Sequence, residues 1–375
     1  MKFVVSSTEL LARLQSVSRV ISSKNSLPIL DNFLFVLKGG FLNITASDLE
    51  TTLKAKMAIE NVTEEGEITV PAKLITDSLR EFADQPLEFK TNESNSIIEI
   101  IWATGNAKLP CTLSDDYPSI PDLSEDNTTI TINSHNLLEG INRTLYATAE
   151  EELRPVMNGV YFDIDTDSTT LVASDAHKLV CYTRHDIKSE SKASFILPKK
   201  PSTVLKNILG KGNEDVTIKF DKRNAYFEFE SFVLVCRLVE GNYPAYRSVI
   251  PKNNTNKLII NRSDFLNSAR RVAVCSNQAS SQVRLKLSYN TLELFAQDLD
   301  FSISANEKLL CQFEGENMEI AFKSTFLIEI LGNLPYTDIS LELSDPSRAA
   351  LILPAGAIDP QEEILALLMP MMVNA

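Results

Sequence analysis

Three stretches of the chain change from strand-like apolar runs to helical spacing, and the three resemble one another. Each begins with a short apolar segment, which predicts a strand, and continues with apolar residues three and four positions apart, which predicts a helix. The segments begin at Ile68, Phe195 and Ile320, so successive starts lie 127 and 125 residues apart. This period is much longer than that of a solenoid. We therefore expect one domain written three times, each copy large enough for its own core.

Two further patterns repeat with nearly the same spacing. One is a strand followed by a polar cap and a helix start, and the other is an aspartate that follows a later strand. These landmarks are Phe3, Ile130 and Leu258 for the strand and helix start, and Asp48, Asp175 and Asp298 for the aspartate. Three patterns in the same order with matching offsets are hard to obtain by chance.

The repeat predicts domains at residues 1–126, 127–254 and 255–375. Proline-containing stretches, each with a Tyr-Pro pair at Tyr117 or Tyr243, are typical of the linkers between them. Each domain holds two predicted helices among many predicted strands. We therefore expect an α+β fold, with antiparallel sheets on one side and helices on the other.

Composition is that of an ordinary globular protein, with 44% hydrophobic and 23% charged residues. The five cysteines are scattered and form no Cys-x-x-Cys pair, which favours reduced thiols over disulfides or a zinc site. Met1 leads almost directly into the first predicted strand, so we expect no signal peptide. No apolar run approaches the length needed to span a bilayer. These features predict a cytoplasmic protein.

Charge is unevenly spread along the chain, whose formal net charge is −14. Over the six predicted helices, Lys and Arg outnumber Asp and Glu by six, so the remaining segments carry a net charge of −20. Such a division could present two faces of opposite sign. It could also arise because helices sample charged residues at random, and the sequence leaves both explanations open.

Catalytic chemistry finds little support in the sequence. His135 lies at a helix start and His185 near a strand end, and neither belongs to a recognisable catalytic motif. Residues 163–168 (DIDTDS) begin like a calcium-binding loop but lack its glycine at the sixth position and its glutamate at the twelfth. We expect a solvated hairpin loop there. The sequence therefore predicts a non-catalytic protein without a metal or cofactor.

One stretch, residues 172–181 (VASDAHKLVC), is more distinctive. Together with residues 154–160 (RPVMNGV) and 368–372 (LMPMM), it resembles the bacterial DNA polymerase III beta subunits, the replicative sliding clamps. Further matches lie in all three repeats: 1–3 (MKF), 27–30 (LPIL), 69–72 (TVPA), 241–247 (GNYPAYR) and 249–252 (VIPK). The resemblance therefore spans the whole chain.

This resemblance implies a ring. In the family, two chains of three DNA-clamp domains join head to tail into six domains, with helices facing the ring interior and sheets outside. We accordingly expect a homodimer that closes around double-stranded DNA regardless of sequence and keeps the polymerase processive. It would contact neither membrane nor cofactor, and would bind DNA polymerase and clamp-loader subunits through short linear motifs. The expected dimer interface joins Leu109 and Cys111 to Val274 and Cys275.

A closed ring is held on DNA by topology, so its contacts with phosphates can be few and independent of sequence. Tight, salt-dependent binding would hinder a protein that must move with a polymerase. The candidate DNA contacts are Lys24, Lys73, Arg80, Arg154, Lys199, Lys200 and Arg270. Any one of them could instead be an ordinary solvated charge.

The resemblance also implies a peptide-binding pocket between the second and third domains. Flexible methionines there suit a surface that accepts several partners. The matching positions are Met157, Ser174, Ala176, His177, Lys178, Leu179, Pro244, Arg247, Val249, Lys323, Phe326, Leu367, Met369, Pro370 and Met371. His177 could alternatively be a structural histidine, and the methionines part of a frayed terminus.

Three positions depart from the family pattern. Ala176 and Lys178 replace the glycine and arginine of the usual Asp-Gly-His-Arg, and Met372 stands where a basic residue often follows. These changes concern the preferred partner motif. Two other functions stay open: a monomeric three-domain peptide-binding scaffold that never encircles DNA, and a hydrolase that uses His177 beside Asp175.

Overall fold

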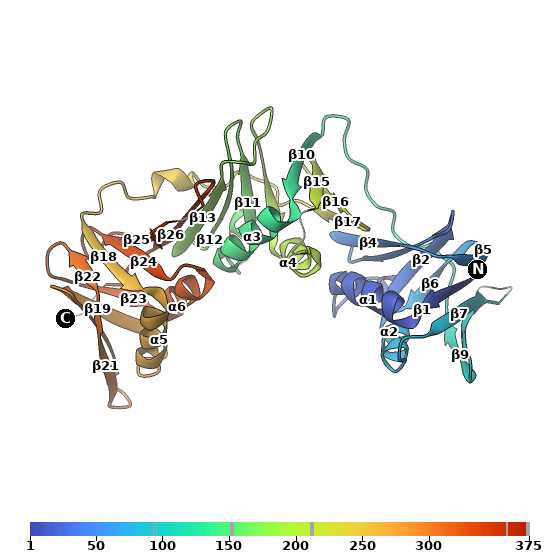
Figure 1. Cartoon of the computed structure of the whole chain (residues 1–375), viewed down its shortest axis with the longest axis horizontal. Coiled ribbons are helices and arrows are strands. Elements are labelled where there is room, and N and C mark those ends of the chain that lie inside the picture. Colours follow the sequence, from blue (N-terminus) through green and yellow to red (C-terminus); the bar gives the residue numbers. More distant parts are fainter. Residues whose placement is uncertain (93, 95, 151–153, 211–213, 358, 373–375) are drawn as a thin grey trace. The chain divides into compact units, whose positions relative to one another are not determined.

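The computed structural model describes residues 1–92, 94, 96–150, 154–210, 214–357 and 359–372 (Figure 1). The chain divides into two compact units. The first comprises Met1–Leu138 and Lys200–Leu238, and the second comprises Glu139–Lys199 and Val239–Ala375. Both units contain strands of the second repeat, because the two groups of strands in this repeat join different neighbours.

The first repeat begins with a helix whose sequence explains both its start and its orientation. Ser6 caps α1 by accepting a hydrogen bond from the Glu9 N–H group, and Leu10, Leu14 and Val17 follow at helical spacing on the buried face. The helices of this repeat are α1 (Ser7–Val17), η1 (Ser18–Val20), η2 (Pro28–Asp31) and α2 (Ala72–Arg80). Its strands are β1 (Lys2–Ser6), β2 (Asn32–Lys38), β3 (Phe41–Ser47), β4 (Thr51–Ala58), β5 (Asn61–Glu64), β6 (Gly66–Pro71), β7 (Pro86–Thr91), β8 (Ile97–Trp102) and β9 (Gly105–Pro110).

The second and third repeats follow the order of the first, except that the described part of the second has no strand between β13 and β14 to match β5. The second has helices α3 (Ser134–Thr144), η3 (Leu145–Ala147), η4 (Pro155–Met157), α4 (Lys199–Ile208) and η5 (Tyr246–Ser248), and strands β10 (Thr128–Asn133), β11 (Gly159–Ile164), β12 (Thr169–Ser174), β13 (Lys178–Arg184), β14 (Ala193–Pro198), β15 (Asp215–Phe220), β16 (Asn224–Phe229) and β17 (Phe232–Arg237). The third has helices α5 (Arg262–Ala273) and α6 (Ser324–Asn333), and strands β18 (Asn256–Asn261), β19 (Gln282–Ser288), β20 (Thr291–Asp298), β21 (Ile303–Leu310), β22 (Gln312–Glu314), β23 (Met318–Lys323), β24 (Asp338–Leu343), β25 (Ala350–Ala355) and β26 (Glu362–Leu368).

The first unit contains two antiparallel sheets. Five strands run in the order β5-β1-β7-β8-β9, and eight run in the order β10-β15-β16-β17-β4-β3-β2-β6. Helices α1 and α2 pack against each other, and α1 also packs on β3 and β4. Phe3, Phe33, Leu10 and Ile75 are among the fully buried side chains, each of which stabilises the fold by about 1.5–3 kcal/mol.

The second unit repeats this plan. Nine strands run in the order β14-β11-β12-β13-β26-β25-β24-β18-β22, and four run in the order β21-β20-β19-β23. Helices α5 and α6 pack against each other, with Phe265, Leu327 and Ile330 in the core between helices and sheets. In Figure 1, β9 and β21 each lie at the edge of their own sheet. Among the described residues, no helix is both long enough and apolar enough to cross a bilayer.

The segment that leaves each repeat pairs with the same position of that repeat. Thr112 pairs with Thr69 in the first repeat, and the N–H group of Val239 donates to the Ile196 carbonyl in the second. In the third, Met371 pairs with Ala321. Thr69, Ile196 and Ala321 each follow the first residue of the repeated strand-to-helix segment, so backbone pairing supports the threefold repeat independently of side-chain similarity.

Two internal junctions join consecutive repeats by antiparallel strand pairing. At the first junction β4 pairs with β17, and at the second β13 pairs with β26. In both cases the strand after the repeated aspartate meets the last strand of the next repeat. The second repeat is thereby divided between the two units.

A carboxylate pair lies at one end of the eight-stranded sheet. Glu214 immediately precedes β15, and Glu230 occupies the turn between β16 and β17 with φ of 43°. Burial, followed by the charge and hydrogen bond of Glu230, raises the pKa of Glu214 above its ordinary value.

We predict that Glu214→Gln raises the melting temperature at pH 8 and flattens its pH dependence. A carboxyl group whose pKa is raised by folding favours the folded state fully below its unfolded pKa, and this contribution is lost as pH rises through the folded value. Thermal unfolding between pH 4.5 and pH 8 measures the effect. Glu240→Gln, on an exposed side chain of the second unit, is the control. Equal melting temperatures for Glu214→Gln and the parent at pH 8 would contradict the prediction.

Candidate functional site

Most of the predicted peptide pocket is built around the turn between β12 and β13. The Asp175 carboxylate accepts hydrogen bonds from the N–H groups of His177 (2.9 Å) and Lys178 (2.8 Å), and Ser174 Oγ donates to the Lys178 carbonyl (2.9 Å). Ala176 has φ of 74°, the left-handed conformation that glycine adopts more readily. The turn is therefore held in one shape by its own side chains.

Lys178 is tied into this turn. Its side chain is only 5% exposed, and its Nζ lies 2.9 Å from an Asp175 carboxylate oxygen and 2.9 Å from one of Glu329 on α6. The same ammonium lies 4.5 Å from the centre of the Phe326 ring. Two carboxylates and one ring thus satisfy the buried cation, which fixes the β12–β13 turn against α6.

Phe326, in the first helical turn of α6, contacts His177, Lys178 and Lys323. The His177 ring stacks on it with centres 5.8 Å apart, and the Lys323 ammonium lies 4.7 Å from its centre. His177 is exposed, whereas Phe326 is partly buried. The ring therefore forms an apolar surface flanked by His177, Lys178 and Lys323.

The base of the site is the pairing of β13 with β26. Leu179 faces Leu367 across this pair, and both are buried. They form a small apolar cluster with Tyr246 and Leu351. Beyond β26 the chain continues along the same surface, because Met369 N–H donates to the His177 carbonyl (2.8 Å) and Met371 N–H to the Ala321 carbonyl (2.7 Å). Of this tail, Met369 is exposed and Pro370 and Met371 are half-buried.

The segment 244–249 forms a second side of the site. The Tyr246 hydroxyl donates to Asp163 (2.7 Å), the Arg247 guanidinium lies 2.9 Å from the same carboxylate, and Pro244 and Val249 are exposed. Tyr161 and Tyr243 stack with centres 4.7 Å apart. No sequence pattern indicated Asp163, Tyr161, Tyr243 and Tyr246 as supports of this site. The solvated-loop interpretation was wrong for Asp163, which lies in β11.

We use the name peptide groove for the surface where the family resemblance predicts peptide binding, which comprises Ala176, His177, Leu179, Val249, Phe326 and Met369. All the sequence-predicted positions lie in the second unit, and all except Met157 lie on β12, the β12–β13 turn, β13, residues 244–249, α6 with the preceding Lys323, or β26 and its tail. Met157, in η4, is half-buried and its carbonyl accepts the Ala149 N–H group (2.9 Å), outside the contacts described above.

The predicted DNA-contacting cations differ in their environments. Lys24, Lys73, Arg154 and Arg270 are exposed. Arg80 forms an ion pair with Asp77, and Lys199 forms one with Glu150, whose pKa is held below its ordinary value by the hydrogen bond and charge of Lys199.

Lys200 differs from the other cations because its ammonium forms an ion pair with Asp48 and donates to the Val20 carbonyl (2.6 Å). The predicted DNA contact is thus engaged inside the first unit. Asp48 is the counterpart of Asp175, so a lysine binds the repeated aspartate at both internal junctions.

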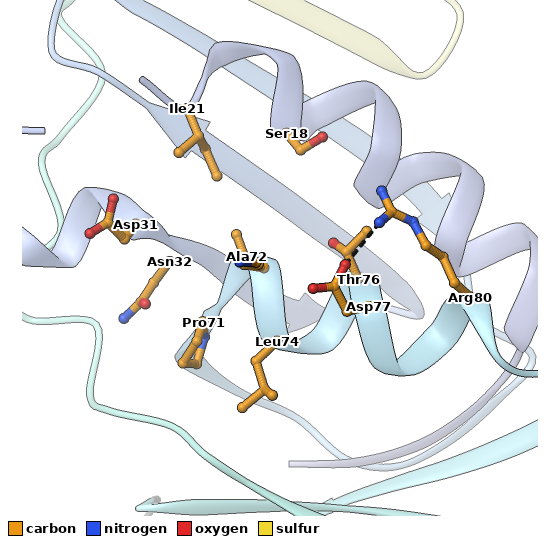
Figure 2. Close-up of a pocket in the computed structure, with 11 residues that line it drawn as sticks. Ser18, Ile21, Asp31, Asn32, Pro71, Ala72, Leu74, Thr76, Asp77 and Arg80 are labelled. Atoms are coloured by element: carbon orange, nitrogen blue, oxygen red, sulfur yellow. Dashed lines mark hydrogen bonds and ion pairs between the residues drawn. The ribbon is translucent and has the colours of Figure 1, made fainter. Parts of the chain in front are cut away.

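A cleft of about 730 Å³ lies at the start of α2 in the first unit (Figure 2). It is lined by Lys73, Leu74 and Arg80 of α2 and by Ile21, which follows η1. Figure 2 shows Arg80 turned back along the helix toward Asp77. Leu74 is the sequence counterpart of Phe326, so the cleft repeats the α6 side of the peptide groove.

The predicted interface residues lie at the ends of two elements. Leu109 belongs to β9 and is buried, as is Cys111, where burial raises the pKa of the thiol to about 11. Val274 follows α5 with 78% of its surface exposed, and Cys275 next to it is half-buried. Within the described part of the chain, no group of three or more His, Cys, Asp or Glu side chains is arranged to hold a metal ion.

We predict that Ala176→Gly stabilises the second unit by about 0.5–1 kcal/mol. A non-glycine residue in the left-handed region costs about 1 kcal/mol, and glycine removes this strain at some cost in chain entropy. Scanning calorimetry measures the change. Ala173→Gly, in the adjoining strand, is the matched control and should destabilise. A lower melting temperature for Ala176→Gly would show that the turn is not strained.

The comparisons with known proteins cover almost the whole chain. Models of the N-terminal, central and C-terminal domains of the DNA polymerase III beta subunit match residues 1–121, 131–245 and 247–372. The beta sliding clamp of Pseudomonas putida is 27% identical over 361 residues, which cover 96% of this chain and 97% of that protein. The beta sliding clamp of Escherichia coli is 28% identical over 346 residues, covering 92% and 93%.

Solved structures agree with these matches. The sliding clamp of Pseudomonas aeruginosa, bound to griselimycin, has a TM-score of 0.94 at 26% identity, with 100% of both chains covered. That of Bartonella birtlesii, also bound to griselimycin, has a TM-score of 0.90 at 30% identity and the same coverage. With three clamp domains matched in order, the chain belongs to the DNA polymerase III beta subunit family.

Proposed function

We propose that the chain acts as a DNA sliding clamp: two copies close head to tail around duplex DNA and hold polymerases and clamp-loader subunits through short linear motifs. Family membership supports this function. The main support for a ring is the way in which consecutive repeats pair their strands. The same type of pairing could join the third repeat of one copy to the first repeat of another.

At both internal junctions, the strand after the repeated aspartate pairs with the last strand of the next repeat. In the third repeat the strand after the repeated aspartate is β21, and in the first repeat the last strand is β9. Neither pairs with another repeat in the described strand order. Both are edge strands, of a four-stranded and a five-stranded sheet. Pairing β21 of one copy with β9 of another would give a sheet of nine strands, the number in the larger sheet of the second unit.

The internal junctions also predict a register. At the first, Thr51 faces Cys236, which lies three residues before the exit position Val239. At the second, Lys178 faces Leu368, which lies three residues before Met371.

The same spacing predicts which residues would face each other between two copies. Ile303 is the counterpart of Thr51 and Lys178. In each repeat the residue after this position pairs with the residue before the repeated aspartate, and in the third repeat these are Ser304 and Gln297. Three residues before the exit position Thr112 lies Leu109. We therefore expect Ile303 of one copy to face Leu109 of the other, and Ser304 to face Lys108.

Exposed apolar side chains support an interface near β21. Val274, Leu299 and Phe301 are each more than two-thirds exposed on the third repeat. A long exposed edge strand with apolar neighbours invites uncontrolled association unless another strand covers it. Closure by a second copy would cover both edges in one symmetric arrangement, and would bring Leu109 and Cys111 toward Val274 and Cys275.

DNA contacts in such a ring need only be weak. Exposed Lys24, Lys73, Arg154 and Arg270 are the cations we propose to meet phosphates, whereas Arg80, Lys199 and Lys200 would first have to leave carboxylate partners. Each phosphate neutralised adds to the salt dependence of binding. Few phosphate contacts and a net charge of −14 therefore suit a protein retained by topology rather than by affinity.

We further infer that the peptide groove receives the linear motifs, that the chain works in the cytoplasm, and that it catalyses no reaction. The Phe326 ring, Leu179, Leu367 and Met369 supply apolar contacts of adaptable shape. A hydrolytic role for His177 gains no support from its stacking on Phe326. The monomeric scaffold is not favoured by the comparisons, since the relatives are beta sliding clamps.

We predict that Ser304→Cys combined with Lys108→Cys forms an intermolecular disulfide on mild oxidation. Directly opposed residues in antiparallel strands have the Cα separations that a disulfide needs, whereas residues two positions away do not. Gel electrophoresis of the variant, with Cys275 and Cys311 replaced by serine, measures the cross-linked dimer. The control pairs Ser304→Cys with Asn106→Cys. Equal cross-linking of both pairs would exclude the proposed register.

We predict that the loaded protein stays on closed circular plasmid and slides off the same plasmid after linearisation. Topological retention requires an unbroken duplex and tolerates salt, because phosphate contacts contribute little. Gel filtration in 0.5 M salt, after loading by the clamp loader of the same organism, measures the retained fraction. Equal loss from both DNAs would exclude an encircling ring.

A further inference from the structure

A second, smaller pocket lies in the first unit, where β4 pairs with β17. Its volume is about 280 Å³. Its lining includes Leu49, Thr52, Pro121, Arg223, Val235 and Arg237. None of these residues belongs to the surfaces proposed above for DNA, for the dimer or for the peptide groove.

This pocket occupies the position that the peptide groove occupies at the other internal junction. Leu49 follows the repeated aspartate as Ala176 does, and both are left-handed, with φ of 77° and 74°. Strand register aligns the floors, because Thr52 faces Val235 as Leu179 faces Leu367.

The walls of the two sites correspond as well. Pro121 corresponds to Arg247, because each lies four residues after the tyrosine of its linker, Tyr117 or Tyr243. Strand positions counted from the paired floor residues match Arg237 with Met369 and Arg223 with Arg348. Corresponding residues therefore surround both internal junctions, one in each unit.

The chemistry of the two sites differs. Thr52 and Val235 offer a ligand less apolar surface than Leu179 and Leu367 do, so this floor suits a small apolar side chain. Arg237 stands where the peptide groove has Met369, and Arg223 is exposed in the bend just before the neighbouring strand β16. Glu50 lies at the rim, 3.8 Å from the Arg237 guanidinium. The lining therefore carries two guanidinium groups and one carboxylate.

The walls are held in place before any ligand arrives. The Tyr226 hydroxyl donates to the Pro121 carbonyl, and the Ser124 N–H group donates to Asp221 (2.9 Å), so the linker is fastened over the sheet. The Leu238 N–H group donates to the Arg223 carbonyl (2.6 Å). A preformed site of this kind loses little entropy when it binds an extended segment.

We propose that this pocket is a second linear-motif site, which binds an extended peptide with a small apolar side chain beside acidic side chains. Val235 and Leu49 would contact the apolar group, and Arg223 and Arg237 would pair with the carboxylates. The inference rests on the proposed peptide groove only through the correspondence of the two sites. The chemical difference predicts that the two sites select different motifs.

The test uses the full chain and a fluorescein-labelled tetrapeptide of sequence EVDV, with KVKV as the matched basic probe. Fluorescence anisotropy should give a dissociation constant for EVDV of roughly 0.1–1 mM, as expected for so small a contact, and at least tenfold weaker binding for KVKV. Arg223→Glu and Leu49→Gly should each weaken EVDV binding about tenfold. Leu49→Gly removes the apolar wall at a position whose backbone conformation suits glycine.

Two control variants separate this site from the peptide groove. Arg348→Glu changes the counterpart of Arg223 in the second unit and should leave EVDV binding unchanged, as should His177→Ala. Loss of binding in His177→Ala but not in Arg223→Glu would place EVDV in the peptide groove and overturn the inference, without touching the proposed clamp function. No saturable binding of EVDV at 5 mM would also overturn it. Retention on circular plasmid tests the clamp function separately.

Discussion

Antiparallel backbone pairing between consecutive repeats is the constraint on which the rest of the structure depends. A strand edge carries unpaired N–H and C=O groups, whose burial without partners is costly. Pairing β4 with β17 and β13 with β26 satisfies these groups and produces sheets of eight and nine strands. The same pairing divides the second repeat between two compact units. A repeat in this chain is therefore a unit of sequence more than a unit of packing.

At each internal junction a lysine ammonium holds the turn that starts the pairing. Lys200 reaches Asp48 from α4 of the next repeat, whereas Lys178 reaches Asp175 from the adjoining strand and then Glu329 on α6. The aspartate position recurs, but the source of its cation does not. A charged pair so placed has few alternative partners, so it fixes the geometry between a turn and the following helix.

The sequence predicted much of the fold, because strand and helix periods are local signals. The α+β class with three clamp domains is confirmed, and the three predicted strand-to-helix segments are β6 with α2, β14 with α4, and β23 with α6. Strand pairing between repeats was not predictable, since any edge strand presents the same backbone groups. The engagement of Lys200 with Asp48 was hidden for a related reason: the two residues are 152 positions apart.

The candidate site shows the same division between local and distant signals. The β12–β13 turn was recognisable from its residues, because Asp175 makes its hydrogen bonds within three positions. Tyr161 of β11 and Tyr243 of the second linker stack on each other, and no local sequence pattern indicated this contact. Of the cations predicted at the groove, Lys178 lies buried among carboxylates and Arg247 lies against Asp163, which no spacing rule indicated.

The electrostatics of the peptide groove follow from these pairings. Lys178 is shared between Asp175 and Glu329, so this buried cluster carries one excess negative charge. Lys323, over the same Phe326 ring, offsets it at the surface. An approaching peptide therefore meets an apolar ring with Lys323 as the nearest more exposed cation, while Lys178 is already satisfied. Removing Lys323 would leave the excess carboxylate charge facing the peptide, so we expect this lysine, rather than Lys178, to set how the groove responds to charged residues beside the apolar anchor.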